Sequence, residues 1–349
     1  MTTTLSFSNF DPNAVGQLGN GIFGLPFDAQ SAQTVIVAVP WEVTTSYGDG
    51  TANGPDAIFE ASAQVDLFHP DFGSAWKSGI ALSPTETAWH VESDRLKTKA
   101  KQIIDAQAEG LRLADDPELV AALDDINRAC ERLHHEVESE VANWIIQGKR
   151  VGLLGGDHSV SLGALRAYAG QYPGFGILQI DAHMDLRDSY EGFRYSHASI
   201  MFNALKIPQV TSLVQVGIRD CCEAEMAVAA ADPRVHVVMD QAIKEAAFSG
   251  LTWKSQCDAI VERLPQYVYI SFDIDGLHPS LCPNTGTPVM GGLQWEEVQF
   301  LFKQLVASGR TIIGFDLVEV SPGDGDWDAN VGARVLYGLF GYGWLSTVK

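Results

Sequence analysis

Strand-like and helix-like segments alternate along the chain, which predicts an α/β protein with a central, mostly parallel sheet. Short apolar runs of strand length recur, as is typical of strands buried on both faces. Segments with helical periodicity lie between several of these runs, and this alternation favours parallel pairing. The chain has 349 residues, of which 46% are hydrophobic and 19% charged. It is therefore long enough to bury a large core and lies outside the composition range of disordered proteins.

The expected elements fall into a sheet region with one helical insertion. Residues 92–149 form a charged stretch, broken near Asp116-Pro117, whose apolar stripe predicts a helical hairpin packed on the sheet. Residues 1–33 lack periodicity and are expected to form an arm or extension, so the single domain spans 34–349. The expected strands are 35–40, 150–156, 175–183, 212–220, 235–240, 267–275 and 311–320, and the expected helices between them include 159–170, 197–207, 253–264 and 293–309.

Charge and cysteine content exclude several classes of function. The 23 basic and 44 acidic residues give a net charge of −21, which disfavours binding to nucleic acid or to an anionic membrane surface. Five cysteines without CxxC spacing indicate neither a disulfide framework nor a structural zinc site, and favour a reducing compartment. The sequence carries no signal-peptide pattern and no apolar run of about 18 residues. We therefore expect a cytoplasmic protein.

Four of the expected strands end in acidic or imidazole side chains. Ligands of such sheets bind beyond the carboxyl ends of the strands, so these positions are the first candidates for a site. Alternate side chains of an extended segment point to the same side, so the acidic side chains of one motif can contact the same bound ion or molecule. The four motifs are Gly155-Gly156-Asp157-His158-Ser159, Asp181-Ala182-His183-Met184-Asp185, Asp273-Ile274-Asp275-Gly276 and Asp316-Leu317-Val318-Glu319.

Six of these side chains form a candidate site for two divalent metal ions, bridged by Asp groups. Two ions would balance the charge of four carboxylates, which would otherwise repel one another strongly if buried together. An oxygen-rich set with about one imidazole per ion suits manganese, with nickel, cobalt or iron as alternatives. Each motif alone could be a helix cap or a turn, but their recurrence at successive strand ends favours metal binding. The six residues are His158, Asp181, His183, Asp185, Asp273 and Asp275.

The order and spacing of several motifs resemble the ureohydrolase family, which includes arginase, agmatinase, formimidoylglutamase and guanidine hydrolase. The resemblance spans about residues 35–345 and rests on GGDHS, DAHMD, YSHAS, SFDIDGL, TGTPVMGG and DLVEVSP. It implies an arginase-like three-layer α/β/α fold and assigns the six residues above as ligands of a binuclear metal centre. It also implies that His197 shuttles protons, that Glu319 grips the substrate guanidinium, and that Thr287 lies near the substrate.

The implied reaction is hydrolysis of a guanidino C–N bond with release of urea. A guanidinium is a poor electrophile, so its hydrolysis needs the strong nucleophile that two metal ions generate from water. Glu319 can pair with guanidinium N–H groups, and His197 can protonate the departing nitrogen. One position departs from the family pattern, because His278 stands where a third Asp is usual. We expect His278 to be a structural or supporting group rather than a ligand.

The substrate is less well determined by the sequence. Residues 186–196 differ from the arginase version of this loop and look closer to agmatinases, whereas 280–295 and 324–339 resemble the guanidine hydrolase branch, whose pocket is small and whose metal is nickel. We therefore expect free guanidine, with agmatine or another guanidino acid or amine as the alternative. Trp327 either forms a wall of the pocket or packs where the last helix begins. The family also implies a homo-oligomer, a trimer or a hexamer.

Two other classes of function are disfavoured. A metal-dependent amide deacetylase would need a Tyr or Arg to polarise a neutral carbonyl, where Glu319 instead suits a cation. A catalytically inactive relative that only binds a partner would be expected to have lost a ligand, and all six are present.

Overall fold

A computed structural model, which describes residues 10–84 and 88–348, contains one eight-stranded sheet in which every strand pair is parallel. The spatial order is β2-β1-β3-β8-β7-β4-β5-β6. The predicted α/β class is confirmed, although β2 is too short to carry a sequence pattern and was not predicted. The strands are β1 Thr34–Val39, β2 Ile80–Leu82, β3 Arg150–Gly155, β4 Phe175–Ile180, β5 Val210–Ile218, β6 Val235–Met239, β7 Tyr267–Asp273 and β8 Thr311–Val318.

Alternate side chains of the strands build two cores, one on each face of the sheet. On β4, Phe175 and Ile177 enter one hydrophobic cluster, while Leu178 and Ile180 enter the other. All four are fully buried, because successive side chains of a strand point to opposite faces and helices cover both. This burial on both faces explains why the strands read as nearly continuous apolar runs.

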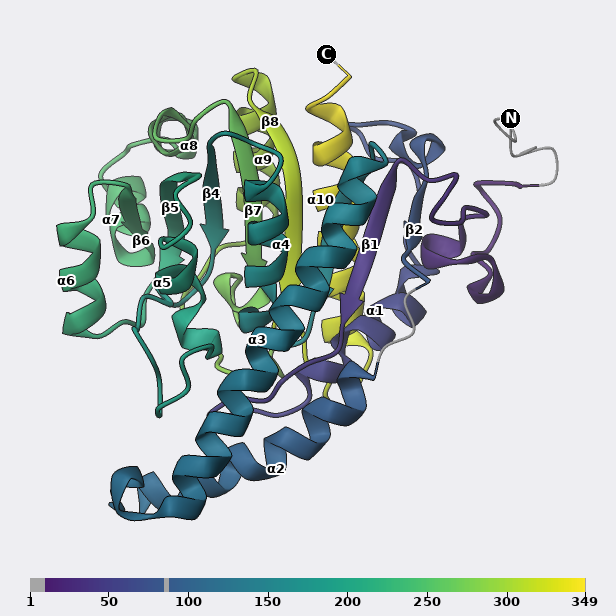
Figure 1. Ribbon diagram of the computed structural model, residues 1–349. Helices are drawn as coiled ribbons and strands as arrows, with labels where there is room; N and C mark the ends of the chain where they lie inside the picture. The colour runs from purple at the N-terminus through teal and green to yellow at the C-terminus, as the bar shows by residue number, and fades with distance from the viewer. Residues whose placement is uncertain (1–9, 85–87, 349) are drawn as a thin grey trace.

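Helices form the two outer layers of the fold (Figure 1). Helices α1, α7, α8, α9 and α10 pack on one core, and α2 to α6 pack on the other. The arrangement is the three-layer α/β/α architecture that the sequence predicts. The helices are α1 Gly54–Ser62, α2 Trp89–Ala108, α3 Pro117–Ile146, α4 Ser161–Ala169, α5 Ile200–Ala204, α6 Glu223–Ala231, α7 Asp240–Phe248, α8 Trp253–Glu262, α9 Trp295–Ala307 and α10 Trp327–Leu345.

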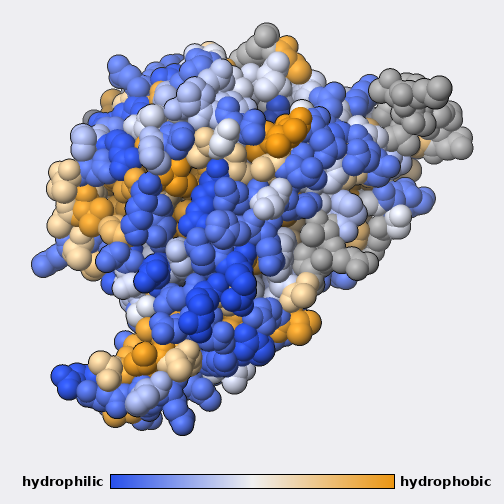
Figure 2. All heavy atoms as spheres, viewed as in Figure 1, coloured by the Kyte–Doolittle hydropathy of each residue, from blue (hydrophilic) through white to orange (hydrophobic). Residues whose placement is uncertain are grey.

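Helices α2 and α3 form a hairpin that extends beyond the sheet (Figure 1). Asp116 caps α3 by accepting hydrogen bonds from the backbone N–H groups of Glu118 (2.9 Å) and Leu119 (3.2 Å), and Pro117 occupies the first helical position. Both features favour a helix start at this point. Figure 2 shows a mostly hydrophilic surface in this view, with apolar side chains gathered over α6 and near the outer end of the hairpin.

The predicted N-terminal arm is only partly described, because residues 1–9 lie outside the described residues. In the remainder of it, Ile22, Phe23 and Leu25 are buried in the core that α1 and α10 also enter. Within the described residues, no helix combines the length and the apolar character needed to cross a membrane.

Two glycines of α10 provide a matched test of core packing. An ideal Cβ on Gly341 would lie 2.3 Å from Cζ of Phe72, whereas one on Gly343 would lie 3.4 Å from Cδ of Arg150. The Phe72 ring cannot retreat easily, because it is 3% exposed and stacks on His69 with a centroid separation of 4.0 Å.

We expect Gly341→Ala to lower the free energy of unfolding by about 1–3 kcal/mol, the usual cost of overpacking a core. Gly343→Ala should instead raise it by up to about 1 kcal/mol, because Ala is the better helix former. Urea denaturation followed by circular dichroism measures both values. Equal stability of the two variants would show that α10 does not pack as described.

Candidate metal centre and active site

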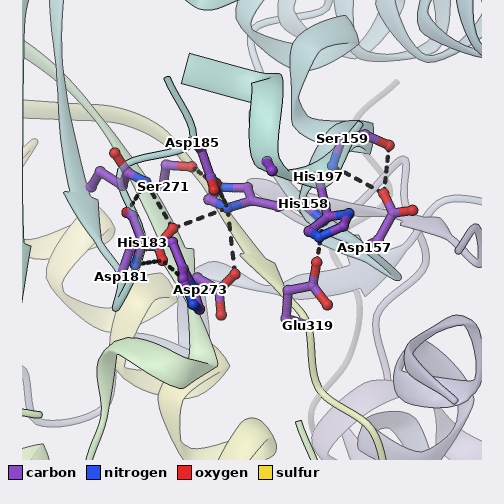
Figure 3. Close-up of polar contacts among 12 residues, drawn as sticks. Asp157, His158, Ser159, Asp181, His183, Asp185, His197, Ser271, Asp273 and Glu319 are labelled. Atoms are coloured by element: carbon purple, nitrogen blue, oxygen red, sulfur yellow. Dashed lines mark hydrogen bonds and ion pairs between the residues drawn. The ribbon is translucent and has the colours of Figure 1, made fainter. Parts of the chain in front are cut away.

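The four strands that end in acidic motifs lie next to one another in the sheet. Strands β3, β8, β7 and β4 are consecutive in the spatial order, and all are parallel. Their carboxyl ends therefore meet at one edge, which is where α/β sheets bind ligands. The six predicted metal ligands come together there, and Figure 3 labels all of them except Asp275.

The six residues form two groups that share one carboxylate. In the first group, Nδ1 of His158 lies 3.0 Å from Oδ2 of Asp185, 3.2 Å from Oδ2 of Asp181 and 3.4 Å from Oδ2 of Asp273. In the second group, Nδ1 of His183 lies 3.0 Å from Oδ2 of Asp275 and 3.6 Å from Oδ1 of Asp181. Each oxygen of Asp181 thus faces a different histidine, the position expected of a bridging carboxylate.

Left-handed backbone conformations aim two acidic side chains at this edge. Asp185 has φ 54° and Glu319 has φ 64°, values that cost energy in a residue other than glycine and that cluster at functional sites. The Asp185 carbonyl accepts hydrogen bonds from two amides at the start of α5, each 3.1 Å long. The Glu319 amide donates to the Gly156 carbonyl at 2.8 Å, and the Glu319 carbonyl accepts from Oγ1 of Thr285 at 2.8 Å. These contacts hold the strained residues in place.

A second layer of polar residues, which the sequence analysis did not assign, orients the predicted ligands. Nε2 of His158 contacts Oγ of Ser271 at 2.9 Å, and this hydroxyl donates to Asp316 at 2.9 Å. Nε2 of Gln179 donates to Oδ2 of Asp181 at 2.7 Å. Contacts of this kind set the orientation and tautomer of metal-binding groups.

The sequence does carry a sign of this second layer. Ser271 and Gln179 each stand two residues before a predicted ligand, in strands that are otherwise apolar. Side chains two residues apart on a strand lie on the same face. A single polar residue two positions before a predicted metal ligand therefore indicates a side chain that can hydrogen-bond to the metal centre.

The electrostatics of the centre fit a pair of cations. Burial and the neighbouring Asp181 raise the pKa of Asp185 to about 7, and burial together with Asp275 and Asp181 raises the pKa of Asp273 well above its usual value. Nδ1 of His158 is buried and makes no hydrogen bond, although three carboxylate oxygens converge on it. Despite the burial of His158, these carboxylates raise its pKa well above the usual value, so they favour positive charge at this position. Divalent metal ions would supply that charge, and the residues present suit them.

A cavity of about 160 Å³ opens above this centre. His183, Asp185 and His197 belong to its lining, as does the predicted substrate neighbour Thr287. The remaining lining residues come from three segments: Ser46 in the loop after β1, Arg187, Tyr190 and Ala198 in the loop after β4, and Asp220, Cys221 and Glu225 after β5. Oγ1 of Thr287 also donates to Oδ2 of Asp275 at 3.3 Å.

Glu319 and Trp327 lie outside the lining of this cavity. Glu319 is 4% exposed, and its Oε1 accepts the backbone N–H of His158 at 2.8 Å. Burial and the nearby Asp157 raise the pKa of Glu319 well above its usual value. Trp327 is 53% exposed and donates from Nε1 to the Ser280 carbonyl at 2.9 Å, so it packs at the start of α10.

His197 and His278 occupy different surroundings. The ring of His197 meets the ring of Tyr190 edge-on, with centroids 6.2 Å apart. Burial and the nearby His183 lower the pKa of His197 to about 4, so its imidazole is neutral at pH 7. His278 points into its own turn, where Nδ1 contacts Oγ of Ser280 at 2.9 Å.

The sequence and fold of the chain match those of known proteins. The model of the arginase family matches residues 32–341. An N(1)-aminopropylagmatine ureohydrolase of Thermus thermophilus is 31% identical over 91% of this chain and 94% of its own length, and the agmatinase of Proteus mirabilis is 30% identical over 89% and 86%. The solved structure of the agmatine ureohydrolase of Thermoplasma volcanium superposes with a TM-score of 0.68 at 25% identity, over 91% of this chain and 92% of that one. The chain therefore belongs to the arginase family of ureohydrolases, as its motifs predict.

Proposed function

We propose that this arginase-family hydrolase uses two divalent metal ions to cleave the C–N bond of a small guanidino substrate and release urea. The observation that carries the proposal is the pair of His/Asp groups that share Asp181 at the base of a cavity. His158, Asp185 and Asp273 would hold one ion together with Asp181. His183 and Asp275 would hold the other with the second oxygen of Asp181.

The metal pair supplies a strong nucleophile at neutral pH by lowering the pKa of a water molecule. Either Ni²⁺ or Mn²⁺ suits a set of carboxylates with one imidazole per ion. The chain itself contributes charge balance, because four buried carboxylates oppose the four positive charges. Ser271 and Gln179 hold the ligands in orientation through the contacts described above.

Glu319 and His197 are the residues that we assign to the substrate. Oε1 of Glu319 is occupied by the His158 amide, which leaves Oε2 for a guanidinium N–H group. A guanidinium beside it would favour the charged carboxylate and counter the effect of burial on its pKa. His197 lines the cavity. Its neutral imidazole would take up a proton released by the attacking water and pass it to the departing nitrogen, which cannot leave as an anion.

Free guanidine is the substrate that we propose first. The cavity of about 160 Å³ lies below the range of about 300–1,000 Å³ of pockets that enclose drug-sized ligands, which supports a substrate with little or no tail. A guanidino amine such as agmatine is the second candidate. Two observations favour it. Relatives 29–31% identical are named for agmatine or aminopropylagmatine, and Asp220 belongs to the cavity lining, where a carboxylate would suit an ammonium group. We also propose a cytosolic homo-oligomer, a trimer or a hexamer, from the family resemblance.

We expect the purified protein to bind two divalent ions per chain. His183→Ala should lower this number because it removes a predicted ligand and leaves Asp181 and Asp275 less compensated. His278→Ala is the matched control, since its imidazole faces its own turn, and should retain both ions. Elemental analysis after reloading the apo-protein measures the stoichiometry. Full metal content in His183→Ala would contradict the assignment.

We expect urea release from guanidine, with more activity in the nickel-loaded than in the manganese-loaded protein. The specificity constant for guanidine should exceed that for agmatine. Guanidine has no tail to supply binding energy, so an enzyme that acts on it must obtain that energy from a tight pocket around the guanidinium. A urea assay with guanidine, agmatine, arginine and guanidinobutyrate tests both metals. A tenfold preference for agmatine would assign the second candidate and leave the metal centre untouched.

Substitutions of the two substrate residues should have different kinetic effects. Replacing His197 by Ala should lower kcat by about 10²-fold or more with little change in KM, because it removes a proton donor that acts in the transition state. Glu319→Gln should worsen both kcat and KM, because a neutral amide cannot pair with a guanidinium. Steady-state kinetics at constant metal content measures both. Small and equal losses would show that other residues carry these roles.

A further inference from the structure

The α2–α3 hairpin contacts both of the loops that wall the cavity. One of them, residues 41–53 after β1, carries Ser46, and the other, residues 186–196 after β4, carries Arg187 and Tyr190. Neither helix of the hairpin contributes a side chain to the cavity lining. The hairpin reaches the cavity walls through the loops that it holds. Separately, α3 contacts the segment of His158, where Nε2 of His134 lies 3.0 Å from the Ser159 carbonyl.

A buried carboxylate organises the 41–53 loop. Glu42 is 6% exposed, and its Oε2 accepts hydrogen bonds from the Gly50 amide (2.8 Å), from Oγ1 of Thr51 (3.1 Å) and from the Ala52 amide (3.2 Å). One oxygen thus gathers three donors from the far end of the loop and folds the segment back on itself. Gly50 has φ 112°, a conformation that glycine adopts readily, so this closure has no side-chain clash.

Helix α2 supplies the positive charge that this carboxylate requires. Nζ of Lys97 contacts Oε1 of Glu42 and lies 3.0 Å from Oδ1 of Asp49. One turn earlier, Oγ of Ser93 accepts the Glu42 amide at 3.0 Å. Burial alone would lower the pKa of Lys97, but the contacts with Glu42 and Asp49 outweigh it and its pKa is raised. Lys97 therefore remains charged and ties both ends of the loop to α2.

The loop held in this way touches three parts of the active site. Ser46 lines the cavity, and Oγ1 of Thr44 accepts the His197 amide at 3.4 Å. The Gly48 amide donates to the Gly286 carbonyl at 3.0 Å, in the segment that carries Thr287. A displacement of this loop would reshape the wall of the cavity without altering any predicted metal ligand.

The hairpin holds the opposite wall through two more contacts. Nε2 of Gln107, near the end of α2, donates to the Glu191 carbonyl at 2.9 Å. Oδ1 of Asn127, on α3, accepts the Arg194 amide at 2.9 Å. Both backbone groups lie in the 186–196 loop, on the C-terminal side of Tyr190. Two helices therefore anchor two loops that approach the cavity from different strands.

We propose that the α2–α3 hairpin sets substrate affinity by fixing the separation of these two loops, with Lys97 as the positioning residue of the 41–53 loop. Gln107 and Asn127 position the 186–196 loop in the same way. The proposal rests on the function proposed above, since it concerns the binding of the same guanidino substrate. Lys97 is not part of the cavity lining, and its ion pairs are with Glu42 and Asp49, so its effect would reach the reaction through the 41–53 loop.

Lys97→Met tests the proposal, because methionine keeps much of the length of the side chain and removes its charge. Lys97→Arg restores the charge, and Lys101→Met removes a charge one turn further along α2 from an exposed side chain. We expect Lys97→Met to raise KM about tenfold while kcat changes less than threefold and two metal ions per chain are retained. Lys97→Arg should recover most of the affinity, and Lys101→Met should match the unchanged protein.

Hydrogen–deuterium exchange gives a measurement that does not depend on activity. The amides of Gly50 and Ala52 bond to Glu42, so peptides spanning 42–53 should exchange at least fivefold faster in Lys97→Met and at the original rate in Lys101→Met. If no guanidino compound is hydrolysed, this measurement still decides whether Lys97 positions the loop, and the proposed function alone fails.

Three outcomes would overturn the proposal. They are an unchanged KM with faster exchange, an unchanged exchange rate in 42–53, and equal effects of the Lys97 and Lys101 substitutions. If Lys97 only stabilised the fold, Lys97→Met would lower the melting temperature and leave KM unaltered. Measuring KM and kcat separately distinguishes this case from the proposal. If Lys97→Met does not fold, Asn127→Ala takes its place, with KM and exchange in 186–196 as the measurements.

Discussion

The structure depends on bringing four carboxylates together where water cannot screen them. Asp181, Asp185, Asp273 and Asp275 are each at most 5% exposed, and ionised groups at such separations repel one another strongly unless cations lie between them. Burial and this repulsion together raise the pKa values of Asp185 and Asp273. Under the proposed function, a pair of divalent ions would offset it, and the same ions would activate water. Charge balance and catalysis thus both require a site for two cations among these carboxylates.

A parallel sheet meets that demand with few residues. Adjacent parallel strands end at one edge, so four short motifs from distant parts of the chain reach one point without long side chains. The left-handed conformations of Asp185 and Glu319 then turn acidic groups toward that point, and the surrounding hydrogen bonds bear the strain. Buried groups such as Ser271 and Asp316 complete the arrangement, because a polar group buried without a partner is costly.

The sequence predicted the α/β class and most of the strands, since a strand buried on both faces appears as an apolar run. It could not predict that β3, β8, β7 and β4 are consecutive, because strand order is set by packing between distant segments. It did not name β2, which has three residues, or the short helices α1, α6 and α7. The alanine-rich sequence of α6 carries only a weak apolar stripe. The six proposed ligands were named from motif spacing, and the structure gathers them. The loop contacts of Glu42 were not foreseen, because its partners Lys97 and Ser93 lie more than 50 residues away.

The proposed function places the chemistry and the entry of the substrate on different parts of the fold. The predicted ligands stand on strand ends within the rigid sheet, where a shift of any one would disturb both metal groups through Asp181. The cavity walls stand on loops, and these loops are tied to a helical hairpin outside the sheet. Substitutions at the hairpin residues that contact these loops would alter the shape of the entrance, whereas α3 also contacts the segment of His158 through His134 and the Ser159 carbonyl. Under the proposed function, the guanidino end of a substrate would meet the strand ends and the remainder would meet the loops, which suits a family whose members are named for substrates of different length.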